Sequence, residues 1–285
     1  EEGELFGLVG PDGAGKTTTL RMLAGVLRPT EGDARVAGIS IRQDPEGAKP
    51  YLAYMAQRFG LYEDLTVAEN LAFYADLFRV PRSERPDRLQ RLYRFSRLNE
   101  FQDRLAGALS GGMKQKLALS CALIHQPRIL LLDEPTFGVD PISRRELWTI
   151  LDEMVAGGTT VVVSTSYMDE AERCQRVALL HRGRLLALDS PTALRDSLPG
   201  EVRAVRGPNP RRIRDLARGT PGVAGAALFG DAVHVRLSQG TAWDAVAATL
   251  GSRGAQLLHS EVIAPGLEDV FIHGVQGGDP EQSRG

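Results

Sequence analysis

The chain has 285 residues, of which 42% are hydrophobic and 25% are charged, and its glycines and prolines are scattered without a period. This composition is typical of a globular protein with enough apolar material for one large or two modest domains, and it excludes disordered, fibrous and collagen-like classes. The 34 basic and 36 acidic side chains give a formal net charge of −2, so no overall charge draws the chain to nucleic acid or to an anionic bilayer. We expect any membrane contact to be made through a partner.

The cysteines and the hydropathy of the chain narrow the possible classes of protein further. The two cysteines, Cys121 and Cys174, form no CxxC or Cys/His pattern, so we expect neither a disulfide framework nor a zinc site, and a reducing, cytoplasmic compartment fits. The longest apolar runs, residues 129–132 and 160–163, have the length of strands and fall well below the ~18 residues of a membrane-spanning helix. The chain begins at Glu1 without a Met and enters an apolar stretch at once, so we expect an N-terminal truncation and no signal peptide.

The first elements in chain order form a strand, loop and helix unit. An apolar run at residues 5–9 predicts a strand, and a Gly-rich turn separates it from a helix predicted at residues 17–27. A second apolar run covers residues 34–41, and residues 51–56 predict another strand.

The middle of the chain is predicted to be an α-helical insertion. Apolar residues show helical spacing at 68–78 and 87–98, and a further helix is predicted from Gly112 to about His125. We therefore expect a helical subdomain over about residues 60–125.

Buried strands and helices then alternate again. Residues 129–132 and 160–164 predict continuous apolar strands, and residues 144–156 predict the helix between them. Continuous apolar strands that alternate with helices indicate an α/β fold with a parallel sheet covered on both faces.

The composition changes near Pro199, and a smaller α+β accessory domain is the simplest account of the chain beyond this point. Its predicted elements are a strand at 202–205, a helix at 210–218, a hairpin across 230–231, a helix at 242–250 and a final strand and helix. The chain ends in polar residues, Gly and Pro with nothing to bury. We expect a first domain at 1–198, an accessory domain at 199–275, and a tail or linker at 276–285.

Residues 10–17 carry the strongest chemical signal. They read Gly-Pro-Asp-Gly-Ala-Gly-Lys-Thr, which fits the phosphate-binding pattern G-x-x-x-x-G-K-[ST], and they lie between a predicted strand and a predicted helix. Glycines at these positions let backbone N–H groups face phosphate oxygens, and the helix N-terminus adds the positive end of its dipole. Lys16 is expected to reach the β- and γ-phosphates of a nucleotide, and Thr17 to ligate Mg²⁺.

Two adjacent carboxylates come directly after the apolar strand at 129–132. We expect Asp133 to hold Mg²⁺, directly or through water, and Glu134 to polarise an attacking water, which is general-base assistance typically worth about 10²–10⁴-fold in rate. An acidic pair before Pro135 is by itself also consistent with a helix cap, and the phosphate-binding pattern favours the catalytic interpretation.

Residues 109–115 read Leu-Ser-Gly-Gly-Met-Lys-Gln. With the two preceding motifs, this segment resembles the LSGGQ-like signature of the ATP-binding cassette (ABC) ATPases, with Met113 at the position of the commonest Gln. The resemblance implies a P-loop NTPase cassette, with a mostly parallel sheet, helices on both faces and an α-helical subdomain. It also implies a head-to-tail dimer, in which the signature of one cassette covers the ATP held by the other. Ser110, Gly111 and Gly112 at a helix start offer a hydroxyl and bare backbone amides to that second anion.

Further landmarks of the family fall on matching residues. Gln57 resembles the Q-loop glutamine, which senses Mg²⁺ and lies beside the groove that receives a coupling helix of the transmembrane subunit. The apolar residues next in the chain, Phe59, Leu61 and Tyr62, either line this groove or pack in the core. Asp140 resembles the D-loop acid that crosses the dimer interface.

These matches imply four sets of site residues. The catalytic set is Glu134 and Ser166, which stands at the switch position. The metal ligands are Thr17, Gln57 and Asp133. The ATP-binding set is Gly10, Pro11, Asp12, Gly13, Ala14, Gly15, Lys16, Thr17, Thr18, Gln57 and Asp133. The signature set, which faces the ATP of the partner, is Leu109, Ser110, Gly111, Gly112, Met113, Lys114 and Gln115.

Two departures from the family pattern bear on activity. Where the family usually has a His after the strand at 160–164, this chain has Ser166, and a hydroxyl neither reaches as far as an imidazole nor carries charge. We expect weak hydrolysis at the site that uses Glu134, or an ATP-retaining structural site; the alternative is that Ser166 acts through a bridging water. The aromatic residue that stacks on adenine in the family lies upstream of the phosphate loop, before Glu1.

The similarity extends to the ATP-binding subunits of ABC-2 type drug exporters, tightly to about Pro191 and loosely beyond. It rests on Tyr-Met-Asp-Glu-Ala-Glu at 167–172 and Leu-Glu-Asp-Val-Phe-Ile at 267–272. A Ser at the switch is similar to the first cassette of tandem multidrug exporters, in which the polar tail would link two cassettes. The resemblance implies ATP and Mg²⁺ as cofactors, and ABC-2 type transmembrane permease subunits and a second cassette, as a second copy or a tandem partner, as partners. It implies no nucleic acid, and a peripheral place on the cytoplasmic face of the inner (plasma) membrane.

Two other functions stay open at this stage. One is a soluble ABC protein that acts on ribosomes or nucleic acid, and the other is a regulatory cassette that binds ATP without hydrolysing it. The arginines of the accessory domain alone favour a nucleic-acid partner, and a solvated, mixed-charge surface is the simpler interpretation of them. They are Arg203, Arg206, Arg211, Arg212, Arg214 and Arg218.

Overall fold

The computed structural model describes residues 1–57 and 60–278, and the chain divides into two compact units, Glu1–Arg184 and Leu185–Gly285. The division falls earlier than the boundary that the composition suggests after residue 198. The reason is that α8 (Pro191–Asp196) packs against α11 (Leu267–Gly278), which belongs to the second unit.

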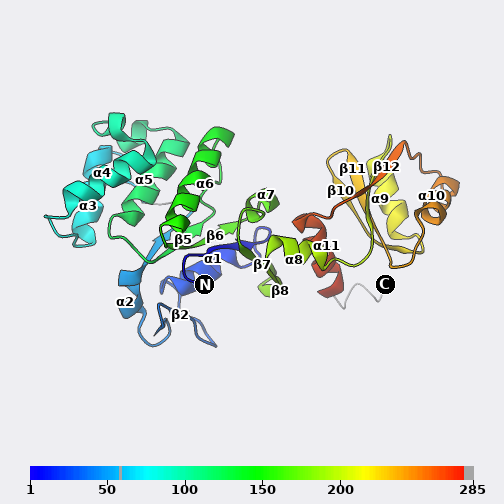
Figure 1. Cartoon of the computed structure of the whole chain (residues 1–285), viewed down its shortest axis with the longest axis horizontal. Coiled ribbons are helices and arrows are strands. Elements are labelled where there is room, and N and C mark those ends of the chain that lie inside the picture. The colour runs from blue at the N-terminus through cyan, green and yellow to red at the C-terminus, as the bar shows by residue number, and fades with distance from the viewer. Residues whose placement is uncertain (58–59, 279–285) are drawn as a thin grey trace. The chain divides into compact units, whose positions relative to one another are not determined.

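Within the described residues, a six-stranded sheet has the order β4-β5-β6-β1-β7-β8 (Figure 1). Its strands are β1 (Leu5–Val9), β4 (Leu52–Met55), β5 (Ile129–Asp133), β6 (Thr160–Thr165), β7 (Arg176–His181) and β8 (Arg184–Asp189). β1 is parallel to β6 and β7, and β5 is parallel to β4 and β6. The parallel pairing of apolar strands confirms the predicted α/β class.

Both faces of this sheet are covered. Leu8 and Leu131 belong to a core cluster with α1 (Lys16–Leu23), while their strand neighbours Val9 and Leu132, which point to the opposite face, are also fully buried. On that second face α6 (Pro141–Ala156) contacts β6 and β1. The loops that leave the carboxyl ends of β1, β5 and β6 therefore meet at one edge of a rigid, two-sided layer.

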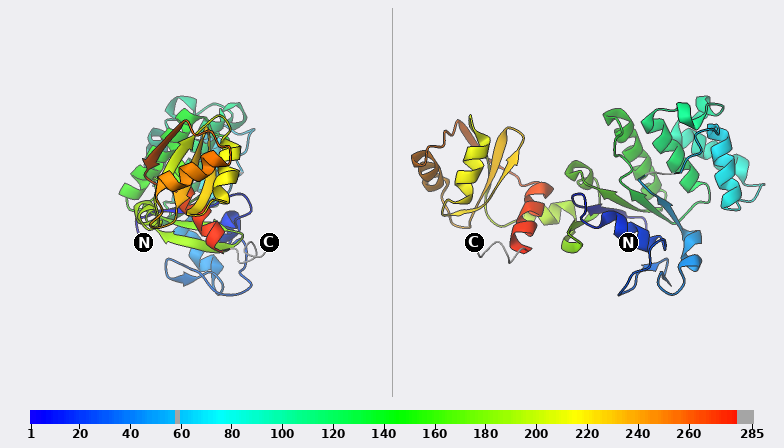
Figure 2. Two further views of the ribbon diagram at one scale, coloured as in Figure 1. Left: turned by 90° about the vertical axis from the view of Figure 1, so that its right-hand side faces the viewer. Right: turned by 180° about the vertical axis from the view of Figure 1, so that it is seen from behind.

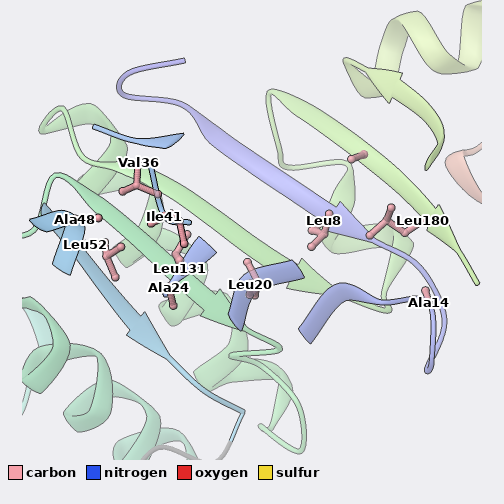
Figure 3. Close-up of a cluster of buried hydrophobic side chains, with 11 residues drawn as sticks. Leu8, Ala14, Leu20, Ala24, Val36, Ile41, Ala48, Leu52, Leu131 and Leu180 are labelled. Carbon is pink, nitrogen blue, oxygen red and sulfur yellow. The ribbon is translucent and has the colours of Figure 1, made fainter. Parts of the chain in front are cut away.

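A cluster of buried aliphatic side chains fixes α1 on the sheet. Figure 3 shows Leu20 of α1 with Leu8 of β1, Leu131 of β5 and Leu180 of β7. Leu20 is fully buried, and burial of one such side chain stabilises a fold by roughly 1.5–3 kcal/mol. The cluster thereby holds the start of α1, and the loop before it, at a fixed position next to β1.

Three elements near the N-terminus differ from the sequence prediction. α1 ends at Leu23 rather than at residue 27, because Gly25 adopts a φ of +67° that an α-helix does not allow. The apolar run at 34–41 is a hairpin of β2 (Arg35–Val36) and β3 (Ile39–Ser40), with positive φ at Ala37 and Gly38.

The predicted helical insertion is confirmed. It consists of α3 (Val67–Leu77), α4 (Arg85–Ser96) and α5 (Gly111–Leu123), which lie together in Figure 1 and in the right-hand view of Figure 2. α3 begins with a capping box, in which the side chains of Thr66 and Glu69 each accept the backbone N–H of the other residue. The remaining short helices of the first unit are α2 (Pro45–Ala48), α7 (Met168–Ala171) and the 3₁₀ turns Lys49–Tyr51, Asn99–Phe101 and Ala106–Ala108.

After β8 and α8, the second unit has the β-α-β-β-α-β chain order and then a helix. Its elements are β9 (Val202–Arg206), α9 (Pro210–Arg218), β10 (Val223–Phe229), β11 (Ala232–Leu237), α10 (Trp243–Ser252), β12 (His259–Ile263) and α11. The strands form an antiparallel sheet in the order β10-β11-β9-β12, with a core of Val205, Ile213, Val233 and Leu250.

The end of the chain departs from the expectation of a tail from residue 276. α11 continues to Gly278, and residues 279–285 lie outside the described part of the chain. In residues 1–57 and 60–278 the structure has no helix with the length and apolar character that crossing a membrane requires.

Candidate functional site

The loop between β1 and α1 borders a cavity of about 340 Å³. Its lining comprises Asp12, Gly13, Ala14, Gly15, Lys16, Thr17, Thr18, Gln57, Glu134 and Phe137. Gly10 has no room for a side chain, because an added Cβ would lie 2.3 Å from the backbone oxygen of Leu180. Gly13 and Gly15 have φ of +77° and +107°, so the turn uses the conformational freedom of glycine.

Lys16 is buried at the floor of this loop and has four oxygen partners. Its Nζ donates to the backbone oxygens of Gly10 (2.7 Å) and Pro11 (3.1 Å) and to Oγ of Ser166 (2.8 Å), and lies 3.0 Å from Oε1 of Glu134. Only 4% of its side chain is exposed, so these oxygens compensate for the loss of hydration. The lysine charge is thus held where the loop turns.

Asp133 ends β5 and lies next to Thr17. Its Oδ1 accepts hydrogen bonds from Thr17 Oγ1 (3.0 Å) and Ser164 Oγ (2.8 Å), and its Oδ2 accepts one from the hydroxyl of Tyr54 (3.3 Å). Burial, together with the charge of Asp133, raises the pKa of Tyr54, so this hydroxyl stays a donor. Sequence reasoning missed Tyr54 and Ser164, because only the packing of β4 and β6 on β5 brings them to Asp133.

Glu134 lies where Gln57, Ser166 and Lys16 converge. Its Oε2 accepts from Gln57 Nε2 (3.1 Å), and its Oε1 accepts from Ser166 Oγ (3.1 Å). The backbone of Glu134 has a φ of +49°, which is uncommon for a residue other than glycine. Its N–H donates to the backbone oxygen and to Oγ of Ser164. The structure therefore brings together four residues that are distant in the sequence.

The signature segment lies away from this cavity. Ser110 caps α5 by accepting the Met113 N–H (3.3 Å), and Ser110 and Gly111 are exposed. Gly112 is buried against α6, because an added Cβ would lie 2.3 Å from Ser143. Leu109 is buried, and Met113, Lys114 and Gln115 are half-buried. Among the described residues that line the cavity, none comes from this segment.

Comparison with known proteins decides the family. The ABC transporter family profile matches residues 1–137. The chain is 43% identical over 283 residues to the probable multidrug ABC transporter ATP-binding protein YbhF of Escherichia coli, an alignment that covers 99% of this chain and 48% of YbhF. It is 35% identical to the daunorubicin resistance ATP-binding protein DrrA2 of Streptomyces coeruleorubidus, over 95% of this chain and 86% of DrrA2. The chain belongs to the ABC transporter family.

A solved structure supports the same conclusion. It is described as a dimeric, post-hydrolysis state of the ATP-binding cassette MJ0796 bound to ADP and Pi, and it matches with a TM-score of 0.60 and 27% identity. The match covers 67% of this chain and 86% of that chain. The predicted P-loop NTPase cassette is thus confirmed, and the chain spans about half the length of YbhF.

Asp140, which the sequence comparison with the family matches to the D-loop acid, caps its own helix. Its Oδ1 accepts the N–H groups of Ile142 and Ser143, both at 3.0 Å, at the start of α6. These hydrogen bonds, the one from Ser143 foremost, lower the pKa of Asp140 and keep its exposed carboxylate charged.

The oxygen ligands at the cavity suit a hard cation that is shared with a nucleotide. The described residues contain no cluster of three His, Cys, Asp or Glu side chains that would form a metal cage by themselves. Thr17 Oγ1 and Asp133 Oδ1 are nevertheless 3.0 Å apart, and Gln57 lines the same cavity. Mg²⁺ prefers few protein ligands together with phosphate oxygens and water, so these residues fit it.

The apolar residues after Gln57 are not all core residues. Leu61 is half-buried, and Tyr62 is 45% exposed, with its ring edge-on to that of Phe73 at 4.6 Å between centroids. Phe59 lies outside the described residues. Phe73 and Phe78 of the helical subdomain are also exposed, so aromatic side chains form a surface beside the loop that carries Gln57.

Proposed function

We propose that this chain is the ATP-binding and ATP-hydrolysing subunit that energises a membrane exporter of drugs or other small molecules. The observation that carries the proposal is the convergence of Ser166 with Lys16 and Glu134, which line the 340 Å³ cavity beside the phosphate loop. The names of YbhF and DrrA2, a probable multidrug transporter protein and a daunorubicin resistance protein, support export as the purpose of the ATPase.

ATP is proposed to bind with its phosphates in the loop of residues 10–17. Lys16 would exchange its contacts with Gly10, Pro11 and Glu134 for phosphate oxygens, since charge-assisted hydrogen bonds to phosphate are stronger than those to neutral carbonyls. Thr17, Asp133 and Gln57 would hold Mg²⁺, which neutralises phosphate charge when bound. The positive end of the α1 dipole adds to this preference for an anion.

Glu134 is proposed to act as the general base for the attacking water. Its carboxylate lines the cavity, and Gln57 and Ser166 orient it through hydrogen bonds at 3.1 Å. A carboxylate in this position accepts a proton from water at the moment of attack. Because Lys16 also lies 3.0 Å away, nucleotide binding frees Glu134 from an ion pair before it acts.

Ser166 sets the expected rate. Its hydroxyl bridges Lys16 and Glu134, accepting from the first and donating to the second, and it is shorter than the imidazole of the family pattern. We propose slow turnover at this site, because a positioned polar group at a reacting phosphate contributes on the order of 10²–10³ in rate. The competing proposal is a water that bridges Ser166 to the phosphate.

A second cassette is proposed to complete the site. Ser110 and Gly111 are exposed at the start of α5 and lie apart from the cavity of their own chain, so they are available to the ATP of another cassette. The dimeric state of MJ0796 supports this arrangement. The partner is either a second copy or a tandem cassette, and the 48% coverage of YbhF is consistent with the tandem.

Transmembrane permease subunits, of the ABC-2 type by resemblance, are proposed to dock on the exposed aromatic surface of Tyr62, Phe73 and Phe78. The surface lies beside the Gln57 loop, and an apolar helix from the permease would bury it. This contact would place the chain on the cytoplasmic face of the inner membrane, and it requires no nucleic acid.

The test of this function is the rate of phosphate release from MgATP by the chain and its Ser166→His variant. We expect the variant to release phosphate faster by up to on the order of 10²-fold, because the imidazole restores a positioned contact at the γ-phosphate. The measurement uses the full assembly with the other site disabled, so that one site is read alone.

Glu134→Gln separates the alternatives. Rapid release by the unmodified chain that Glu134→Gln abolishes would favour the bridging-water proposal. Rapid release that is insensitive to Glu134→Gln would refute the assigned roles. ATP binding without release, in both the Ser166 and the His forms, would indicate a non-hydrolysing regulatory cassette.

A further inference from the structure

A buried carboxylate, Glu170 of α7, lies directly behind the proposed catalytic residues. Only 2% of its surface is exposed, yet three donors reach it from three other segments. Thr136 Oγ1 and Arg144 Nε each donate to its Oε1 at 2.6 Å, and Thr165 Oγ1 donates to its Oε2 at 2.5 Å. Neither the proposed binding of ATP nor its hydrolysis uses this group.

The end of β6 explains how Glu170 bears on the site. Side chains alternate along a strand, so Ser164 and Ser166 point toward Asp133 and Glu134 while Thr165 points to the opposite side. Ser164 donates to Asp133 and Ser166 to Glu134, whereas Thr165 donates to Glu170. Glu170 therefore holds the end of β6 on the side opposite to Asp133 and Glu134.

The loop after β5 is fixed by the same carboxylate. Thr136 lies two residues after Glu134, and its backbone oxygen also accepts the N–H of Val139, which stabilises the turn toward Asp140. Glu170 thus holds both the loop that carries Glu134 and the strand end that carries Ser166. A displacement of either loop changes the 3.1 Å distance between Ser166 Oγ and Glu134 Oε1.

Arg144 connects this carboxylate to the first turn of α6. Its guanidinium pairs with Glu170 and with exposed Asp169, and it stacks over the ring of Tyr167 at 4.4 Å from the centroid. Because Asp140 caps the same helix, the D-loop is held through Arg144 to the segment after Ser166. Four segments that surround the site therefore meet at one side chain.

The chemistry of this position requires a carboxylate. All three partners are donors, and Thr165 Oγ1 already accepts the N–H of Tyr167 at 3.0 Å, which leaves its proton for Glu170. A carboxylate offers only acceptor oxygens to such a set. The amide of Gln would place N–H groups against these donors and leave Arg144 without its buried counter-charge.

We propose that Glu170 is a positioning residue for ATP hydrolysis, which sets the spacing of Glu134 and Ser166 by anchoring Thr136, Thr165 and Arg144. This inference rests on the proposed function. In this proposal Glu170 makes no contact with the nucleotide. The rate of hydrolysis therefore depends on Glu170. The affinity for ATP depends on residues 10–17 and not on Glu170.

The test compares Glu170→Gln with Asp169→Asn. Asp169 is the matched control, because it is the adjacent acid and pairs with the same arginine but is 74% exposed. Calorimetry measures the affinity for MgATP, and single-turnover phosphate release measures the rate, both in the unmodified chain and in the Ser166→His background, which is expected to be faster. We expect Glu170→Gln to slow release by on the order of 10- to 100-fold with an ATP affinity within about twofold of the parent. Asp169→Asn is expected to change neither quantity.

A second pair of variants tests the same anchor from the other side. Thr165→Val keeps the shape and removes the hydroxyl, and Thr165→Ser keeps the hydroxyl. We expect Thr165→Val to slow release as Glu170→Gln does and Thr165→Ser to restore it. This pair decides the question if Glu170→Gln fails to fold.

Amide hydrogen exchange provides a readout that needs no turnover. Positioning predicts faster exchange confined to peptides over residues 134–140 and 164–168 in Glu170→Gln, with unchanged exchange in β7 and α5. Faster exchange throughout the first unit, a parallel loss of affinity and rate, or an equal effect of Asp169→Asn would overturn the inference. An unmodified chain that binds no ATP would instead refute the proposed function, and the exchange pattern would still decide the role of Glu170.

Discussion

The ammonium group of Lys16 makes its contacts with oxygen atoms that phosphate oxygens would replace. Two of these are neutral backbone oxygens, of Gly10 and Pro11, and the others belong to Ser166 and Glu134. The buried ammonium group thus has oxygen partners in this structure, and phosphate oxygens, which carry more charge, can replace them. This arrangement explains at the scale of one residue why the loop needs a lysine at its end.

Lys16→Ala is therefore expected to weaken the binding of MgATP by at least about tenfold, because hydrogen bonds to charged groups are worth roughly 1.5–3 kcal/mol. Titration calorimetry measures the effect, with Lys49→Ala as the control, since Lys49 is an exposed lysine of the same unit. Unchanged affinity in a Lys16→Ala protein that gives the circular dichroism spectrum of the parent would contradict the binding assignment.

Motif residues of the site could be predicted from the sequence, and their supporting residues could not. Lys16, Thr17, Asp133 and Glu134 belong to short patterns whose chemistry depends on neighbours in the chain. Tyr54 and Glu170 reach the site or its back only through the pairing of strands and the placement of α7. Tyr54 lies 79 residues from Asp133, and Glu170 lies 34 and 26 residues from Thr136 and Arg144, so no local spacing indicates these contacts.

At the scale of elements, an ion pair ties the start of β1 to the start of β7. Glu4 directly precedes β1, is buried, and accepts two hydrogen bonds from Arg176, at 2.6 and 2.8 Å. Phe6 of β1 pairs with Arg176 in the sheet. The hydrogen bond with Arg176 lowers the pKa of Glu4 from 4.5 to about 2.

Because the pKa of Glu4 is lower in the folded chain, its charge stabilises the fold above pH 4.5, and this stability is lost as the pH falls toward 2. We expect Glu4→Gln to lower the free energy of unfolding at pH 7 by about 1–3 kcal/mol, with the half-exposed Arg176 reducing the effect. The difference between Glu4→Gln and the parent should shrink steadily between pH 4.5 and pH 2.

Urea denaturation followed by the fluorescence of Trp148, in a Trp243→Phe background, measures this difference in the first unit. Glu2→Gln is the control, because Glu2 is 86% exposed and pairs with Arg128 at the same end of the chain. A Glu4→Gln effect that is as large at pH 2 as at pH 7 would exclude the ion pair as its cause.

Some helices and strands were missed or misplaced in the sequence prediction. β7 and β8 were not predicted, although the apolar run from Val177 to Leu180 is as long as the run at 129–132 that predicted β5. α6 begins at Pro141, three residues before the predicted start, although Asp140 and Pro141 form a cap and first-turn pair that indicates this boundary. The strand at 5–9 and the helix at 210–218 were predicted with their observed bounds, because turn residues flank them.

At the scale of the whole molecule, the phosphate loop and the signature segment lie apart within one chain, and we propose that they are half-sites for different nucleotides. Lys16 lines the cavity, whereas exposed Ser110 and Gly111 lie away from it on α5. Gly112 is packed closely against Ser143 of α6, which fixes the start of α5 on that helix. The proposed complete site therefore requires a second cassette.

We expect MgATP, and not ADP, to drive association of the chain, with the longest-lived dimer in Glu134→Gln, because slow hydrolysis retains the ATP that joins the two half-sites. Ser110→Asp should abolish this association with an unchanged affinity of the monomer for ATP. An Asp at this position still caps α5, yet it places a negative charge against the phosphates of the partner. Sedimentation velocity of both variants, with each nucleotide, measures the effect. If Glu134→Gln stays monomeric with MgATP, both alone and in tandem with a second cassette, the two half-sites do not meet and the sandwich arrangement is wrong for this chain.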